Sequence, residues 1–198
     1  MIKAELVKEL RERTGSGIMD CKKALQETKG DLEKAIIYLR ERGLAAADKK
    51  AGRATKDGYI DAYIHAGGKL GVLIEVNCET DFVAKTDDYR HLCRELAMQV
   101  AAANPLYVER TDVPQERIDT EKSVLETQAK NEGKPDKVVE KIVTGRMEKF
   151  YQEICLMEQP YIREPDRIVK DLVNEYITKL GENIVVRRFC RFQLGEEG

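Results

Sequence analysis

One short run of side chains in this sequence could take part in chemistry: Cys78–Asp81, which is followed at once by Phe82. A thiol next to carboxylates can act as a nucleophile when a histidine base lies close enough to activate it. The two histidines, His65 and His91, are not near this run in the sequence. We therefore expect a structural thiol, a turn histidine at position 65 and a solvated helix histidine at position 91.

Motifs that hold nucleotides or metals are missing from the sequence. It contains no GxxxxGK[ST] loop, no GxGxxG after a strand, no HExxH and no CxxC pair. Each of these motifs supplies backbone amides or ligands at a spacing that phosphate or zinc requires. We therefore predict that the chain carries no cofactor and no metal of its own, and that it is not an enzyme.

The segment Thr80-Asp81-Phe82 comes directly after a strand-like run and can be interpreted structurally. In that interpretation Thr80 is the N-cap of a helix, and Asp81 is favoured in the first turn by the helix dipole. Phe82 then packs back into the core. Residue types alone favour this structural interpretation over a functional one.

Three short amphipathic helices are predicted in residues 1–43, where apolar side chains recur at helical spacing. The first stops at Thr14–Gly17, the second ends at Gly30, and the third begins at Asp31, a good N-cap, and ends at Gly43. On this pattern alone Leu10 and Ile18 are core residues. The sequence therefore predicts a compact three-helix bundle, followed in residues 44–57 by a basic, partly helical and exposed tether.

Beyond the tether the pattern changes to strand-like alternation, and residues 58–198 are predicted to form an α+β core domain. Tyr59 to His65 and Leu70 to Asn77 flank Gly67-Gly68, which is typical of a β-hairpin. The sheet is completed by a final strand, giving a small antiparallel three-stranded sheet with packed helices. The remaining predicted elements are a helix through Tyr89 and Val100 that Pro105 ends, helices at Gln115–Asn131, Pro135–Met157 and Ile168–Leu180, an extended segment at Gln159–Arg163, and the strand Ile184–Leu194.

Length and composition narrow the class of protein. The 198 residues are 42% hydrophobic, enough to build a core, and the net charge is only −2 although 35% of residues are charged. The longest uncharged run, Leu96–Val108, is too short for the roughly 20 residues that span a bilayer. The N-terminus carries early charges, unlike a secretory signal, and the five cysteines are odd in number. We therefore expect a cytoplasmic protein with mostly buried thiols.

Four segments together resemble the bacterial elongation factor Ts family. They cover both ends and the middle of the chain in the family's order. The pair TGSGIMDCKKAL and NCETDFVA is the most specific part of the resemblance. The segments are LVKELRERTGSGIMDCKKAL, GDLEKAIIYLRERG, GVLIEVNCETDFVAK and GENIVVRRF.

The resemblance implies an exchange factor that binds elongation factor Tu in its GDP-bound and nucleotide-free states and accelerates GDP release. In the family the Asp-Phe pair of the motif, here Asp81 and Phe82, is the intruding element near the partner's magnesium and phosphate groups. The resemblance therefore also implies that one motif displaces Mg²⁺ from the partner, namely Thr80, Asp81, Phe82 and Val83. Thr80 is interpreted mainly as a cap, and Val83 and Ala84 as packing.

The resemblance also implies that the N-terminal bundle has a fold like a ubiquitin-associated domain and docks on the partner through Arg11, Ile18 and Met19. Ile18 stands where relatives often have Met, a change that nearly conserves volume. With one sheet-and-helix unit the chain resembles the short class of this family, which is expected to form a homodimer by pairing its sheets. Cys190 is expected in the last strand, where pairing of the sheets would bring it near its symmetry mate, but a reducing compartment disfavours a disulfide there.

A different class of function is suggested by charge, because residues 1–56 hold 14 basic and 9 acidic side chains while the remainder is acidic. Basic helices bind phosphate backbones, so an RNA-binding or ribosome-associated module is the alternative. The acidic side chains are interspersed with the basic ones, and no aromatic RNA-binding signature is present. We therefore expect no direct contact with nucleic acid and no contact with a membrane.

Overall fold

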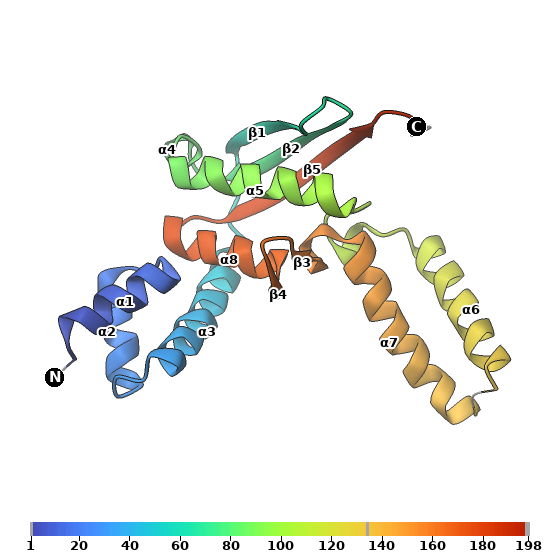
Figure 1. The fold of residues 1–198 in the computed structure, drawn as a ribbon, viewed down its shortest axis with the longest axis horizontal. Helices are drawn as coiled ribbons and strands as arrows, with labels where there is room; N and C mark the ends of the chain where they lie inside the picture. Colours follow the sequence, from blue (N-terminus) through green and yellow to red (C-terminus); the bar gives the residue numbers. More distant parts are fainter. Residues whose placement is uncertain (1, 134, 197–198) are drawn as a thin grey trace. The chain divides into compact units, whose positions relative to one another are not determined.

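A computed structural model describes residues 2–133 and 135–196 of the chain (Figure 1). The described residues form an α+β fold with eight α-helices and an antiparallel sheet of three strands, as predicted. The helices are α1 (Ala4–Thr14), α2 (Ile18–Glu27), α3 (Leu32–Lys50), α4 (Asp81–Ala84), α5 (Asp87–Ala103), α6 (Gln115–Asn131), α7 (Asp136–Ile154) and α8 (Val169–Leu180). The strands are β1 (Asp57–Ile64), β2 (Leu70–Cys78), β3 (Pro160–Tyr161), β4 (Glu164–Ile168) and β5 (Ile184–Gln193), and two 3-10 helices span Arg110–Asp112 and Leu156–Glu158.

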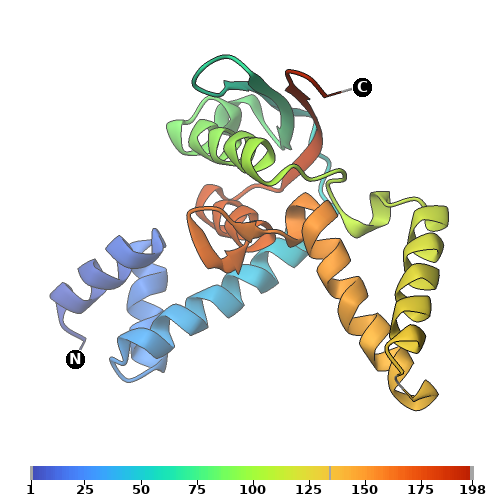
Figure 2. The same ribbon diagram turned by 45° about the vertical axis from the view of Figure 1, so that its right-hand side comes forward.

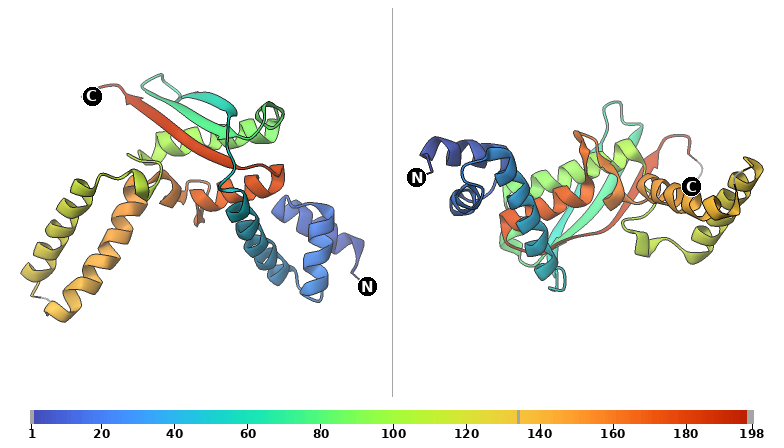
Figure 3. Two further views of the ribbon diagram at one scale, coloured as in Figure 1. Left: turned by 180° about the vertical axis from the view of Figure 1, so that it is seen from behind. Right: turned by 90° about the horizontal axis from the view of Figure 1, so that it is seen from below.

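The three-stranded sheet has the order β1-β2-β5, so β2 is its central strand (Figure 3). The predicted hairpin between β1 and β2 is confirmed. Gly67 and Gly68 both have positive φ, a conformation that glycine adopts without strain, and the backbone N–H of His65 donates to Leu70 to close the turn. From Val72 to Cys78 the residues of β2 alternate between buried positions and half-buried or exposed ones, because successive residues of a strand point to opposite faces.

Two compact units divide the chain. One consists of Met1–Ile60, Glu75–Cys93 and Asp171–Val186, and the other of Asp61–Ile74, Arg94–Lys170 and Arg187–Gly198. Each unit includes part of the sheet and part of α5. The separate division into bundle, tether and core domain stays a prediction, as does the likeness of α1–α3 to a ubiquitin-associated domain.

The first three helices surround a small core of their own in the first unit. Asp31 caps α3 as predicted, since its carboxylate accepts from the backbone N–H of Lys34 at 3.0 Å. Leu10 is completely buried, which confirms its predicted core role. The other buried members of the cluster are Cys21, Ala24, Leu25 and Ala35.

The predicted end of the third helix at Gly43 is wrong. Helix α3 continues to Lys50. Gly43 lies inside this helix and is buried, because α8 packs closely against the backbone there. A Cβ at Gly43 would lie 3.2 Å from Oγ1 of Thr178, whose hydroxyl donates to the Gly43 carbonyl at 3.3 Å. Ala47, one turn later, is buried as well. The first part of the predicted, partly helical tether is thus the end of α3, which is mostly exposed but buries Ala47, and glycine stands at position 43 for space.

In the second unit, α6 and α7 run side by side as a helical hairpin (Figure 2). At its base the Arg110 guanidinium donates to the carboxylates of Glu148 and Glu158, and these hydrogen bonds raise the pKa of Arg110. The hairpin has its own apolar core of Leu125, Ala129, Val139, Val143 and Met147.

The strand pair β3–β4 was only partly predicted, as an extended segment followed by a helix. Tyr161 of β3 is buried, and its hydroxyl donates to Glu95 of α5, which also accepts from Arg163. Glu95 is more than 60 residues away from Tyr161 and Arg163 in the sequence, so local patterns do not predict the strand pair.

Among the helices in the described part of the chain, none combines the length and the apolar character that a membrane span requires.

Candidate functional site

The motif Thr80–Val83 sits where the central strand ends and a helical turn begins. Strand β2 ends at Cys78, and α4 starts at Asp81 after only two further residues. Thr80 is extended, with φ −135° and ψ 155°, and its hydroxyl oxygen accepts from the backbone N–H of Val83 at 3.5 Å. The predicted N-cap at Thr80 is therefore confirmed.

Below this turn the chain is fixed by buried groups. The hydroxyl of Tyr89, on α5, donates to the Val76 carbonyl of β2 at 2.7 Å, and the Cys78 thiol donates to the Thr80 carbonyl at 3.2 Å. Burial raises the pKa of both the Tyr89 hydroxyl and the Cys78 thiol. Cys78 is thus protonated at neutral pH and is a structural thiol rather than a nucleophile.

Two carboxylates connect the end of β2 to the turn between α8 and β5. Glu182 accepts from the backbone N–H groups of Glu79 and Thr80, both at 3.0 Å, and from the Thr80 hydroxyl at 2.6 Å. Glu79 in return accepts from the backbone N–H of Asn183 at 2.7 Å and pairs with Arg53 at 3.3 Å. The Asn183 hydrogen bond, and secondarily Arg53, hold the pKa of Glu79 below its ordinary value. We call this reciprocal arrangement of Glu79 and Glu182 the carboxylate clasp.

Local sequence patterns do not predict the clasp. Its two acids are about 100 residues apart, and neither lies in a pattern that predicts pairing. The only available signal is the segment Gly181-Glu182-Asn183, which ends α8 and also forms part of the family resemblance.

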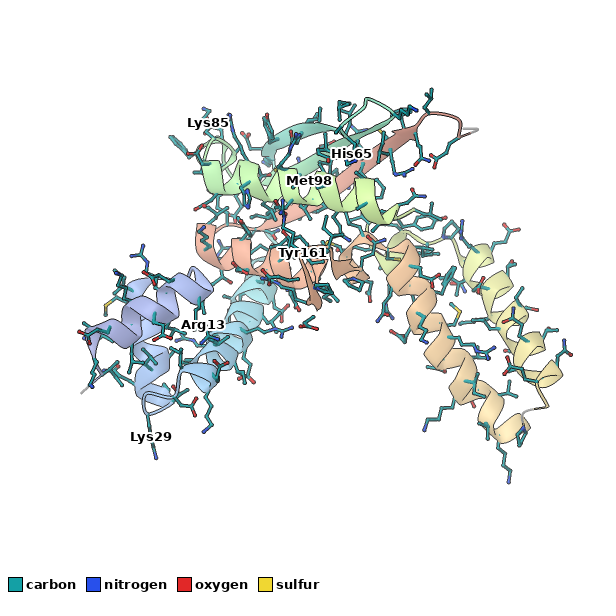
Figure 4. All side chains as sticks on the ribbon, viewed as in Figure 1. Arg13, Lys29, His65, Lys85, Met98 and Tyr161 are labelled. Carbon is teal, nitrogen blue, oxygen red and sulfur yellow. The ribbon has the colours of Figure 1, made fainter. Side chains whose placement is uncertain are left out.

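Phe82 points away from its own core, with 79% of its surface exposed. The structural interpretation in which Phe82 packs back into the domain is therefore wrong. Its neighbours behave as predicted, because Ala84 is buried and Val83 half-buried. Asp81 lies in the first turn of α4, and its carboxylate pairs with the Lys85 ammonium at 2.5 Å. Lys85 is labelled in Figure 4.

A second exposed apolar group lies at the start of α2. Ile18 and Met19 have 55% and 73% of their surfaces exposed, and Arg11 on α1 is exposed too. The prediction from periodicity that Ile18 is a core residue is therefore wrong, because the buried stripe of α2 begins at Cys21. The first residue before this helix is Gly17, which offers no side-chain cap.

The predicted site residues fall into two separate groups within the first compact unit. Hydrogen bonds and ion pairs from residues 79–83 reach Glu182 and Lys85, whereas Arg11, Ile18 and Met19 belong to α1 and α2. The structure therefore offers two surfaces and no enclosed reaction centre built from them.

The remaining candidate residues have ordinary structural settings. His65 is exposed, and its Nδ1 lies 2.8 Å from the Tyr63 hydroxyl; His91 is exposed on α5. Burial raises the pKa of the Cys155 thiol to about 11. Within residues 2–133 and 135–196, no three His, Cys, Asp or Glu side chains are grouped so that they could hold a metal ion. That the chain uses no cofactor or metal stays a prediction.

Comparison with known proteins decides the family. A sequence profile described as "Elongation factor TS" matches residues 28–196. The chain belongs to the elongation factor Ts family. Relatives named elongation factor Ts include those of Thermoanaerobacter sp. strain X514, 64% identical over 99% of this chain and 96% of the relative, and Moorella thermoacetica, 65% identical over 99% and 97%. The relative from Heliobacterium modesticaldum is 63% identical over 99% of this chain and 91% of its own length.

Membership in the family places the chain among the factors of translation elongation in protein biosynthesis. It implies that the chain is a nucleotide-exchange factor for elongation factor Tu. An exchange factor speeds the release of a bound nucleotide and does not catalyse a chemical reaction. Membership in the family thus implies elongation factor Tu as the partner.

Proposed function

We propose that this chain accelerates GDP release from elongation factor Tu by inserting Asp81 and Phe82 near the partner's magnesium and phosphate groups. The observation that supports this proposal is the exposure of Phe82 at a turn held from below by buried hydrogen bonds. A large aromatic side chain that gains little from its own domain has most of its apolar surface left to bury in a partner.

The free energy gained by burying Phe82 in the partner is large enough to account for a marked acceleration of GDP release. Burying a phenylalanine side chain contributes roughly 1.5–3 kcal/mol, which corresponds to about 10- to 150-fold in an equilibrium or rate. If that contact forms fully only when the nucleotide site is distorted, it offsets the strain and weakens GDP binding. By reciprocity GDP must weaken the binding of this chain by the same factor, and GTP binding then completes its release.

Asp81 is suited to act on the groups that hold the partner's magnesium ion. In the free chain its carboxylate pairs with Lys85, and about half of each side chain or more is exposed to water. Exposed ion pairs of this kind add little to stability, so Asp81 can leave Lys85 when a partner offers another contact. The motif Thr80–Val83 then combines a negative charge and an apolar wedge on one short turn.

The start of α2, together with Arg11, is proposed as the docking surface on the partner. Ile18 and Met19 are exposed side by side in sequence, and an apolar side chain with a flexible thioether adapts to a partner's surface. Arg11 adds a planar cation that can recognise a carboxylate. This surface would contribute affinity, whereas the motif would act on the nucleotide site.

We also propose a homodimer formed through the second unit. There Ile64, Leu73, Phe192 and Leu194 are all exposed and line a shallow groove beside the β1–β2 turn. Phe192 and Leu194 have 69% and 77% of their surfaces exposed, which is unusual for neighbouring large apolar side chains. A second copy would cover this face with an identical one, as two-fold symmetry requires.

The dimer is tested by sedimentation equilibrium. We expect the wild-type chain to have twice the mass of one chain at tens of micromolar, and Phe192→Asp to shift it to the monomer, because a charge would be buried at the interface. Val124→Asp on α6, another exposed apolar position, is the control and should remain dimeric. A wild-type chain that is monomeric at this concentration would contradict the proposal. Cys190 is an exposed free thiol, and we expect no disulfide between the two copies in a reducing compartment.

The exchange activity is tested by stopped-flow release of a fluorescent GDP from elongation factor Tu. We expect micromolar concentrations of the chain to speed release at least about ten-fold, the low end of what burial of Phe82 allows, with no GTP hydrolysis by the chain alone. Unchanged release from a cognate partner would show that the proposed function is wrong.

The RNA-binding alternative gains no support from the bundle. Basic side chains there pair with acids, Lys8 with Glu12 and Arg13 with Glu33, which lowers the positive charge available to phosphates. Binding of labelled RNA at two salt concentrations separates the two functions, because affinity for phosphates falls steeply with salt. We expect no RNA binding at physiological salt.

A further inference from the structure

The carboxylate clasp places three hydrogen bonds on the two residues that come directly before the wedge. Oε2 of Glu182 accepts from the backbone N–H groups of Glu79 and Thr80, and Oε1 accepts from the Thr80 hydroxyl. One carboxylate thereby fixes two consecutive peptide groups and one side chain. Hydrogen bonds to a carboxylate are stronger than those between neutral groups, so the Glu182 carboxylate holds this backbone firmly.

The anchor continues into α4 through Thr80. The same hydroxyl that donates to Glu182 accepts from the backbone N–H of Val83, in the turn that carries Phe82. Phe82 itself is 79% exposed, so packing against its own domain does little to hold it. The direction in which Phe82 projects therefore depends on how the backbone before it is held.

Glu182 is itself well placed to hold this backbone. It lies two residues after the end of α8 at Leu180, and its neighbour Asn183 is buried and donates to the Arg53 carbonyl at 2.9 Å. Glu79 returns the contact by accepting from the Asn183 backbone N–H. The turn that carries Glu182 is thus fixed by contacts on both sides.

We propose that Glu182 is a positioning residue for exchange: its carboxylate holds the backbone of Glu79 and Thr80 so that Phe82 meets the partner in one fixed direction. The proposal rests on the proposed function of Phe82. A wedge that is ordered before binding loses less conformational freedom on binding, and more of its contact energy remains to distort the nucleotide site. Without the Glu182 carboxylate, the chain would still bind elongation factor Tu, but its contact through Phe82 would accelerate GDP release less.

The test compares Glu182→Ala and Glu182→Gln with the wild type in the GDP-release assay, over a full range of chain concentrations. We expect Glu182→Ala to lower the release rate at saturation about ten-fold while the half-maximal concentration changes less than about three-fold. Glu182→Gln should recover most of the rate, because its amide oxygen still accepts from both backbone N–H groups. Glu126→Ala on α6 removes an exposed glutamate of the other unit and should behave as wild type.

This design separates positioning from a general loss of fold. A variant that is merely less folded has fewer active molecules, so its half-maximal concentration rises while its rate at saturation stays at the wild-type value. That result for Glu182→Ala would overturn the proposal. A saturating rate within about two-fold of wild type, with an unchanged half-maximal concentration, would overturn it as well.

Amide hydrogen exchange gives a readout that does not depend on the partner. In Glu182→Ala we expect the N–H groups of Glu79, Thr80 and Val83 to lose protection, while Leu25 and other amides of the bundle keep theirs. Unchanged protection at these three amides would contradict the anchoring. If the wild-type chain failed to speed GDP release, the proposed function would be wrong, and this exchange measurement would still decide whether Glu182 anchors the turn.

Discussion

The end of β2 and the start of α2 both expose large apolar side chains, but they hold them differently. Phe82 follows an N-cap, a buried thiol contact and the carboxylate clasp, which together fix the backbone before it. Ile18 and Met19 follow Gly17, which provides no side-chain cap. This difference fits the roles proposed above, in which the fixed turn at Phe82 acts on the partner's nucleotide site and the start of α2 contributes affinity.

The largest expected effect concerns stability and contrasts two aromatic side chains seven residues apart. Tyr89 is completely buried, so Tyr89→Ala should lower the free energy of unfolding by about 3–5 kcal/mol, as truncation of buried aromatics does. Phe82→Ala should change it by less than about 0.5 kcal/mol, as expected at the surface. Urea unfolding measures both. A loss of more than about 2 kcal/mol for Phe82→Ala would contradict its role as an exposed wedge.

The next effect concerns affinity and tests the α2 surface. Arg11→Ala and Met19→Ala should each raise the concentration for half-maximal GDP release about five- to ten-fold, because an interface side chain that matters contributes more than about 1 kcal/mol. The rate at saturation should stay within about two-fold of wild type. Lys22→Ala, at another exposed position of α2, is the control. A fall in the saturating rate would show that this surface also acts on the nucleotide site.

A smaller effect is expected at Asp81. Asp81→Ala should lower the saturating release rate about five-fold, since it removes a charge but leaves the aromatic wedge in place. Lys85→Ala removes the ion-pair partner instead and should leave the rate at or slightly above that of wild type. Stopped-flow release measures both variants. Equal losses in the two would show that the ion pair, rather than the free carboxylate, is what matters.

The smallest expected effect is the pH dependence of the clasp. The pKa of Glu79 is held below its ordinary value, first by the Asn183 N–H and then by Arg53, so its contribution is complete above the ordinary glutamate value of about 4.3. It is lost as the pH falls through the lowered pKa. The melting temperature of wild type should therefore exceed that of Glu79→Gln near neutral pH, and the gap should narrow below about pH 4. A gap that is constant with pH would mean that the charge of Glu79 does not stabilise the turn.

Features set by neighbouring residues could be predicted from the sequence. The caps at Asp31 and Thr80, the Gly67-Gly68 turn and the buried Leu10 all follow from side-chain types within a few positions. These determinants are local hydrogen bonds, backbone preferences and periodicity. The fold class follows from the same signals, because the change from helical to alternating periodicity separates the bundle from the sheet.

Features set by distant residues could not be predicted. Gly43 was interpreted as a helix end because nothing local shows that Thr178 packs against it. The clasp depends on Glu79 and Glu182, which local patterns do not connect. The exposure of Phe82 was implied by the family resemblance and not by its residue type, since an apolar residue after a strand usually packs inward.

The saturating rate of GDP release tests the account most directly, measured for wild type, Phe82→Ala and Met19→Ala with the same preparation of elongation factor Tu. We expect Phe82→Ala to lose at least about ten-fold in this rate even at saturation, and Met19→Ala to reach the wild-type rate at higher concentration. A Phe82→Ala variant that releases GDP at the wild-type saturating rate would contradict the claim that the exposed turn after β2 carries the exchange activity.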